Sequence, residues 1–132
     1  ISFKINNKIP NNIIAVTGTN GKSSVADFYY QILNLNNKKV ASIGTLGVKS
    51  KHYKRDLSNT TIDPLYLSKI LTILKKQNIN NIIMEASSHG LNQNRLDGLS
   101  FNTGIFTNLS QDHLDYHKNL NRIVLYLFQL SF

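Results

Sequence analysis

Short apolar runs alternate along the chain with longer segments in which apolar residues recur at helical spacing. The runs have the length and composition of buried strands, and they cover residues 13–16, 39–43, 79–86 and 103–107. The segment 22–35 has a one-sided apolar face made of Val25, Phe28, Tyr29, Ile32 and Leu33. This alternation predicts an α/β fold with a mostly parallel sheet and helices on both faces.

A second helix is predicted to begin after Asp63 and to end near Gln77. Asp63 is a good N-cap acceptor, and the fixed φ of Pro64 suits a first helical turn. An apolar face follows, and two lysines lie where the negative end of the helix dipole would be. These residues are, in order, Leu67, Ile70, Leu71, Leu74, Lys75 and Lys76.

The remaining segments carry weaker patterns. Residues 48–57 are mixed and predict a weak strand or an exposed loop, and 87–98 are polar and irregular, with one helical turn. The apolar segment 120–132 predicts a further helix. Residues 1–12 are polar and aperiodic, which is typical of a linker, so we expect one domain over 13–132.

The residues that carry chemistry follow directly after predicted strands. TGTNGKSS (17–24) follows the first strand, Glu85 and SSHGL (87–91) end the third, and TNLSQDHLDYH (107–117) follows the fourth. Ligands of parallel sheets gather at the carboxyl ends of the strands, where neighbouring strands end on the same edge. We therefore expect these clusters to share one edge of the sheet.

The first cluster is typical of a loop that binds phosphate. Gly18 and Gly21 allow the backbone N–H groups to turn toward one anion, and the following helix brings its positive end there. Lys22 supplies a mobile positive charge, and Ser23 a hydroxyl for a magnesium ion. The match to the common P-loop pattern is imperfect, because Val16 stands where its first glycine belongs. The alternative is an ordinary strand-to-helix turn.

Glu85 and His113 are the candidate metal ligands. Glu85 ends an apolar run, and a buried carboxylate without a partner is costly, so a magnesium ion shared with Ser23 is favoured. The alternative is that Glu85 accepts hydrogen bonds from the N–H groups of Ser87 and Ser88. His113 is a metal ligand, a base or a structural residue.

Two hydrolase alternatives are weak. His113 and His117 suggest zinc, but Leu114 stands where the H-E-x-x-H pattern requires glutamate. A Ser/His/Asp arrangement of Ser87 or Ser88 with His89 and Asp97 lacks the G-x-S-x-G turn around the serine. Neither pattern supports hydrolysis as well as the glycine loop supports phosphate binding.

Composition narrows the possible partners. The chain of 132 residues has 15 Lys and Arg against 7 Asp and Glu, a formal charge of +8, which favours acidic ligands. The basic residues are scattered and not interleaved with aromatics, so we expect no nucleic-acid partner. The chain has no cysteine, no signal-peptide pattern and no apolar run near the roughly 18 residues of a membrane span, so we expect a cytoplasmic protein without a membrane partner.

Four motifs together resemble one family. They are TGTNGKSS (17–24), the pair Thr60 and Thr61, MEASSHGLNQNRL (84–96) and FTNLSQDHLDYH (106–117). The chain resembles the central ATP-binding domain of the Mur ligases over about residues 13–117. The first and last motifs are shared with the related folylpolyglutamate synthases, whereas SSHGL with Gln93 and Arg95 is similar to the branch that adds the third amino acid to the peptidoglycan precursor.

The resemblance implies an ATP-dependent, amide-forming ligase of cell-wall synthesis. A carboxylate of UDP-N-acetylmuramoyl-dipeptide would attack the γ-phosphate of ATP, and an amino acid would convert the acyl phosphate into an amide. It implies three residue sets. The phosphates of ATP would be held by Thr17, Gly18, Thr19, Asn20, Gly21, Lys22 and Ser23; magnesium by Ser23, Glu85 and His113; and the sugar nucleotide by Thr60, Thr61, Ser87, Gln93 and Arg95. Lys22, Glu85 and His113 would be the catalytic residues.

The chain also departs from the family pattern. The family has a carbamate-modified lysine after DHLDYH that binds magnesium, and here no lysine follows Lys118. The family's preceding uridine-binding domain and following amino-acid-binding domain are missing from these 132 residues, so we expect a fragment, incomplete at its C-terminus and inactive alone. A nucleotide-binding module without turnover and a basic nucleic-acid binder remain alternatives. The sequence does not tell diaminopimelate from lysine as the added amino acid, and it is silent on oligomeric state.

Overall fold

The computed structural model describes residues 8–57, 60 and 62–110. In this part of the chain, one six-stranded sheet has the order β4–β3–β2–β5–β1–β6. The strands are β1 (Asn12–Thr17), β2 (Val40–Gly44), β3 (Gly47–Ser50), β4 (Lys54–Arg55), β5 (Asn81–Glu85) and β6 (Thr103–Phe106). Neighbouring strands in the sheet are thus mostly distant in sequence, and the chain must cross the sheet between them.

The half of the sheet that includes β1 is parallel, as predicted. β5 pairs in parallel with both β1 and β2, and β6 pairs in parallel with the other side of β1. The segment 48–57, predicted as a weak strand or an exposed loop, contains most of β3 and all of β4, which add antiparallel strands beside β2. A tight turn at Thr45–Leu46 joins β2 to β3, and this turn gives the mixed sequence after Gly47 a partner strand.

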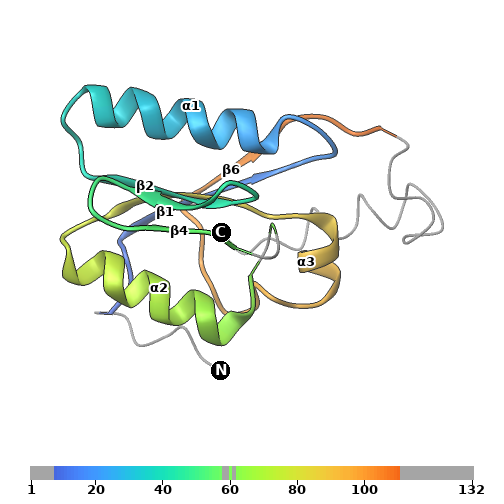
Figure 1. The fold of residues 1–132 in the computed structure, drawn as a ribbon. Helices are drawn as coiled ribbons and strands as arrows, with labels where there is room; N and C mark the ends of the chain where they lie inside the picture. The colour runs from blue at the N-terminus through green and yellow to red at the C-terminus, as the bar shows by residue number, and fades with distance from the viewer. Residues whose placement is uncertain (1–7, 58–59, 61, 111–132) are drawn as a thin grey trace.

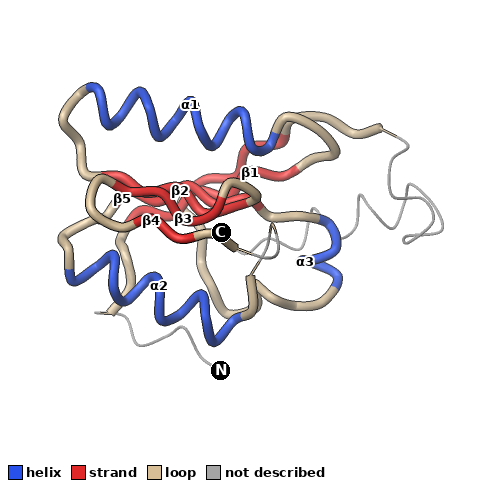
Figure 2. Tube along the Cα trace, viewed as in Figure 1, coloured by secondary structure: helices blue, strands red, loops and turns tan. Residues whose placement is uncertain are grey.

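Helices cover both faces of the sheet, which confirms the predicted layers. α1 (Lys22–Leu35) lies on one face, whereas α2 (Pro64–Lys76) and the short α3 (Ser88–Asn92) lie on the other (Figure 1). Figure 2 shows the strands as one layer between them. No helix within the described ranges is long and apolar enough to cross a membrane.

The α2 face holds the larger part of the core. Leu67, Ile70, Leu71 and Leu74 are all buried, so the predicted apolar face of this helix is confirmed. They pack with residues from β1, β2 and β5, including Ile13, Ile43, Ile82 and Met84. Each such side chain contributes roughly 1.5–3 kcal/mol when it is fully buried, so α2 is a main anchor of the sheet.

The predicted buried face of α1 is partly wrong. Phe28 and Ile32 are 62% and 59% exposed, whereas Ala26 and Tyr30 are the buried residues of this helix. The cluster on this side of the sheet also includes Val16 of β1. Apolar residues occur on more than one side of α1, and the small side chain at Ala26 suits the face that packs closely against the strands.

Helix ends are defined by local chemistry. The carboxylate of Asp63 accepts hydrogen bonds from the N–H groups of Leu65 and Tyr66, so the predicted N-cap is confirmed. Just beyond the last residues of α1, α2 and α3, the chain adopts positive φ at Asn37 (55°), Asn78 (59°) and Asn94 (54°). Asparagine tolerates this left-handed conformation better than most residues with a side chain.

Candidate functional site

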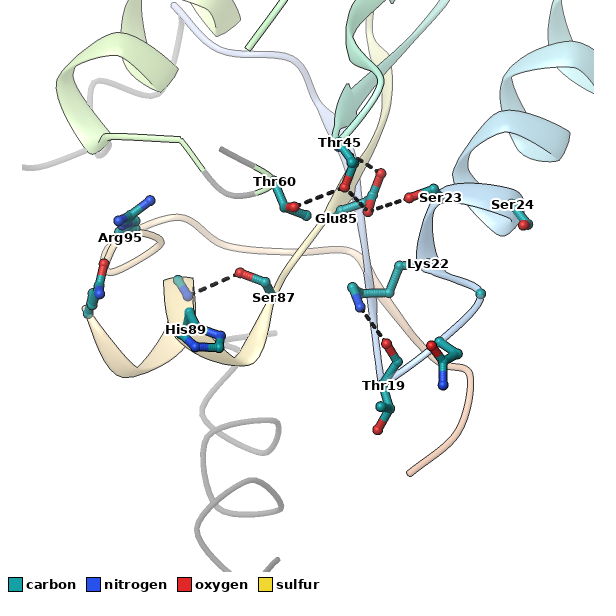
Figure 3. Close-up of a pocket in the computed structure, with 14 residues that line it drawn as sticks. Thr19, Lys22, Ser23, Ser24, Thr45, Thr60, Glu85, Ser87, His89 and Arg95 are labelled. Atoms are coloured by element: carbon teal, nitrogen blue, oxygen red, sulfur yellow. Dashed lines mark hydrogen bonds between the residues drawn. The ribbon is translucent and has the colours of Figure 1, made fainter. Parts of the chain in front are cut away.

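A cavity of about 530 Å³ lies at the edge of the sheet where the parallel strands have their carboxyl ends (Figure 3). The loop after β1, the end of β5, the turn after β2 and α3 all contribute to its wall. The expectation that the first two chemical clusters share one edge is thus correct. The lining residues are Thr19, Asn20, Gly21, Lys22, Ser23, Ser24, Thr45, Thr60, Glu85, Ser87, His89, Gly90, Gln93 and Arg95.

The glycine loop delivers the amino end of α1 to this cavity. β1 ends at Thr17, and α1 begins at Lys22 after Gly21, whose φ of 85° is left-handed. No side chain caps this helix, and the first backbone hydrogen bond runs from Val25 N–H to Gly21 O. The earlier amides of the first turn and the positive end of the dipole therefore face the same wall, an arrangement that suits an anion.

Residues that follow β6 hold the glycine loop in place by hydrogen bonds. The carbonyl oxygen of Asn108 accepts from Thr19 N–H at 2.9 Å, and its side-chain oxygen accepts from Asn20 N–H at 2.9 Å. The hydroxyl of Thr107 donates to Asn20 O at 2.7 Å. The Cβ of a residue larger than glycine at Gly18, where φ is 130°, would lie 2.2 Å from that hydroxyl. The loop is therefore tightly fixed, and position 18 requires glycine because there is no space for a Cβ atom.

Lys22 bends back over the loop. Its ammonium group donates to the carbonyl oxygens of Gly18 and Thr19, both at 2.9 Å. Burial lowers the pKa of Lys22 from its ordinary value, and the nearby charge of Glu85 offsets part of this effect. The ammonium group is thus held beside the loop by neutral carbonyl oxygens, and an anion in the cavity would be a stronger acceptor for it.

Glu85 is the buried acid of the site. It is 2% exposed, and it accepts hydrogen bonds from Ser23 Oγ at 2.9 Å, Thr45 N–H at 3.0 Å and Thr45 Oγ1 at 3.1 Å. The turn that follows is capped by Ser87, whose hydroxyl accepts from Gly90 N–H at 3.1 Å. Glu85 thus faces Ser23, as the metal hypothesis requires.

The oxygen atoms of Glu85 and Ser23 fit magnesium. Mg²⁺ prefers hard oxygen ligands and is commonly held by one or two carboxylates together with substrate phosphates. Across the described ranges, no three His, Cys, Asp or Glu side chains come together to form a metal cluster of their own. A carboxylate and a hydroxyl oxygen, as at Glu85 and Ser23, are donors of the kind that hold Mg²⁺ together with a phosphate ligand.

The opposite side of the cavity is made by side chains of α3 and of the turn that follows it. Figure 3 shows Ser87, His89 and Arg95 across the cavity from Lys22 and Ser23. Gln93 lies at the C-cap of α3. A guanidinium group with amide and hydroxyl neighbours suits a carboxylate or a phosphate ester.

The predicted site residues fall into three groups. Most of them line the cavity. Residues 19–23 lie on one side of it, and the rest of this group are Glu85, Thr60, Ser87, Gln93 and Arg95. Thr17 is buried in β1, where its hydroxyl donates to Ala86 O at 2.7 Å, and Gly18 lies behind the lining. Thr61 and His113 lie outside the described residues.

The residues predicted for this site did not include four that line the cavity, which are Ser24, Thr45, His89 and Gly90. Thr45 directly follows β2, so the rule that ligands gather at the carboxyl ends of parallel strands was the signal that could have found it. The fastening of the loop by Thr107 and Asn108 was also missed, because hydrogen bonds between a loop and a distant segment leave no periodic signal.

The strand, glycine loop and helix, with an acid at the end of the neighbouring strand, define an α/β nucleotide-binding type of domain. The model of the Mur ligase middle domain matches residues 16–130. The chain therefore belongs to the Mur ligase family.

Curated relatives of this chain share one name within the family. The chain is 46% identical to the UDP-N-acetylmuramoyl-L-alanyl-D-glutamate–2,6-diaminopimelate ligase of Wigglesworthia glossinidia brevipalpis, over 83% of this chain and 22% of that one. The ligase of the same name from Buchnera aphidicola subsp. Schizaphis graminum is 44% identical over 91% and 27%. A solved structure of a ligase with this name has a TM-score of 0.79 and 37% identity, and the match covers 92% of this chain and 25% of that one. The chain spans about a quarter of the length of these relatives.

Proposed function

We propose that this chain is the ATP-binding part of a ligase that adds the third amino acid to UDP-N-acetylmuramoyl-L-alanyl-D-glutamate. The observation that carries the proposal is the shared cavity. It brings the glycine loop and Glu85 together with Ser87, Gln93 and Arg95, the residues whose motif narrowed the resemblance. Ser87, Gln93 and Arg95 form a second wall of the cavity, opposite the glycine loop, and a site for ATP alone would not require it.

The wall made by the glycine loop, the start of α1 and Glu85, called the first wall here, would hold ATP and magnesium. The amides at the start of α1 and the ammonium group of Lys22 would bind the phosphates, and Lys22 would stabilise charge that develops during transfer. Ser23 and Glu85, together with His113, would hold Mg²⁺, which when bound neutralises phosphate charge. Thr17 and Gly18 would contribute by shaping the loop.

The second wall would hold the sugar nucleotide with its dipeptide. Arg95 can pair with two oxygens of one anionic group, and Ser87, Gln93, Thr60 and Thr61 would complete the contacts. With the dipeptide oriented there, its carboxylate can attack the γ-phosphorus of ATP and form an acyl phosphate with release of ADP. The amino group of the incoming amino acid then attacks the acyl carbon, and phosphate leaves as the amide forms.

The names of the relatives favour 2,6-diaminopimelate as the incoming amino acid. This choice was open from the sequence, because the selecting residues lie in a domain beyond the matched one. A cytoplasmic location, where the precursor and ATP are available, is part of the same proposal.

Calorimetric titration of the 132-residue chain tests the ATP site. We expect heat of binding with Mg-ATP that is lost in Lys22→Ala and retained in Lys51→Ala, in which an exposed lysine outside the cavity is removed. Binding of UDP-N-acetylmuramoyl-dipeptide should be at least tenfold weaker in Arg95→Ala. Equal Mg-ATP binding by Lys22→Ala and by the unmodified chain would refute the proposal.

Amide formation is tested in a chimera in which this chain replaces the matching segment of the Buchnera ligase. We expect diaminopimelate-dependent release of phosphate from ATP. A chimera that folds and binds both ligands but releases no phosphate would favour a nucleotide-binding module without turnover.

A further inference from the structure

Thr45 lies between residues assigned to different ligands. Its hydroxyl is 3.1 Å from Oε2 of Glu85, on the magnesium side, and 2.9 Å from the hydroxyl of Thr60, on the sugar-nucleotide side. Figure 3 shows Thr60, Thr45, Glu85 and Ser23 as one line of hydrogen bonds across the cavity. Thr45 therefore connects Glu85 to Thr60 through hydrogen bonds of a single hydroxyl group.

The direction of these hydrogen bonds follows from the donor inventory. An ionised carboxylate only accepts, so the single hydroxyl proton of Thr45 is directed to Glu85. The hydrogen bond between Thr45 and Thr60 must then use the proton of Thr60. A ligand that takes the proton of Thr60 for itself leaves the Thr45 oxygen without this donor and changes how Thr45 holds Glu85.

The backbone around Thr45 supports the carboxylate separately from the side chain. Thr45 N–H donates to Oε1 of Glu85 at 3.0 Å, and a Cβ at Gly44 would lie 2.2 Å from the same oxygen. Gly44 thus lets the carboxylate approach the end of β2, and the amide holds one oxygen. The hydroxyl of Thr45 acts on the other oxygen, the one that Ser23 also contacts. The two contributions can be separated by mutation.

We propose that Thr45 is a positioning residue that orients the Glu85 carboxylate for Mg-nucleotide and couples nucleotide binding to occupancy of the sugar-nucleotide wall through Thr60. The inference rests on the proposed function, because it uses the two ligands assigned there. Thr45 touches neither reacting atom in this scheme, and it acts through Glu85 and Thr60.

The test is titration of the 132-residue chain with ATP, with and without Mg²⁺ and with and without saturating UDP-N-acetylmuramoyl-dipeptide. Thr45→Val removes the hydroxyl and keeps the shape and the amide. We expect a roughly fivefold weaker Kd for Mg-ATP, an unchanged Kd for ATP without magnesium, and loss of the effect of the sugar nucleotide on Mg-ATP binding. Thr45→Ser keeps the hydroxyl and should restore all of these values.

Thr72→Val is the matched control, because its hydroxyl donates to Ser68 O within α2, outside the cavity. It should leave each Kd unchanged. Thr45→Ala serves as a second variant if valine lowers the melting temperature by more than Thr72→Val does.

The outcomes separate the inference from the proposal beneath it. A chain that binds no Mg-ATP overturns the proposed function and the inference together. Normal Mg-ATP binding that is unaffected by the sugar nucleotide, or equally affected in Thr45→Val, overturns the inference alone. A loss of affinity in Thr45→Val that is the same with and without magnesium would show a merely structural role and would also overturn it.

Discussion

The two walls of the cavity are built by different means. The wall formed by residues 19–23 depends on backbone shape, since it presents the first turn of α1. It is fixed by a hydrogen bond that Thr107 donates to the loop and by two that Asn108 accepts from it. The wall around α3 presents side chains, with Arg95, Gln93 and Ser87 facing the cavity. Backbone amides bind any phosphate, whereas side chains can distinguish one ligand from another. In the function proposed above, the backbone wall holds ATP and the side-chain wall selects the acceptor.

Among the variants considered, Gly18→Ala should have the largest effect, because it disrupts the glycine loop that shapes the backbone wall. The new Cβ would lie 2.2 Å from Thr107 Oγ1 and 2.8 Å from Asn108 O, at a φ that disfavours alanine. We expect a loss of about 3 kcal/mol in the free energy of unfolding by urea, together with loss of Mg-ATP binding. Gly21→Ala is the control, because its Cβ would meet no atom closer than 3.9 Å. It should cost about 1–2 kcal/mol from backbone strain alone, and equal losses would contradict the close-approach argument.

Substitution of Asn108, which supports the glycine loop, and of Arg95, which lines the opposite wall, should separate the two ligands. Asn108→Ala removes the acceptor of Asn20 N–H and loosens the loop, so we expect roughly fivefold weaker Mg-ATP binding and unchanged binding of the sugar nucleotide. Arg95→Ala should do the reverse, with at least tenfold weaker binding of the sugar nucleotide. Calorimetry on both variants measures both ligands. If either substitution weakens both ligands equally, the walls do not act separately.

The smallest effect concerns Lys22 and pH. Burial holds the pKa of Lys22 below its ordinary value of 10.5. Between this lowered pKa and 10.5, the unfolded chain keeps a proton that the folded chain has released, so stability rises with pH in that window. We expect the free energy of unfolding of the unmodified chain to increase relative to that of Lys22→Met as pH rises toward 10.5. Urea titrations measure this difference, and Lys51→Met controls for removal of a charge. A flat difference would show that burial of Lys22 leaves its pKa unchanged.

Much of the fold followed from local signals in the sequence. The Asp63–Pro64 start and the leucine face of α2 gave that helix its correct position, and the runs around Ile13 and Ile82 gave two central strands. The rule for strand ends also placed the glycine loop and Glu85 at one edge. These features are local or depend only on the parallel arrangement of the strands, which is why the sequence was sufficient.

Other features depend on contacts between distant segments. The face that α1 presents to the sheet was partly misassigned, because Phe28 and Ile32 fit the helical period as well as Ala26 and Tyr30 do. The hydrogen bond from Asn20 N–H to the side-chain oxygen of Asn108, and the one from the Thr45 hydroxyl to Glu85, join residues 88 and 40 positions apart. No periodic pattern encodes such pairs, and only the assembled sheet brings them together.

The asparagines that end the three described helices show how this chain tolerates change. At Asn37, Asn78 and Asn94 the requirement is a left-handed backbone, which asparagine meets with its side chain in place. At Gly18 and Gly44 the requirement is absence of a Cβ, because another atom already occupies that space. Sequence drift can therefore exchange asparagine and glycine freely where helices stop. Around the cavity it cannot, and the glycines there should be among the last residues that this chain can lose.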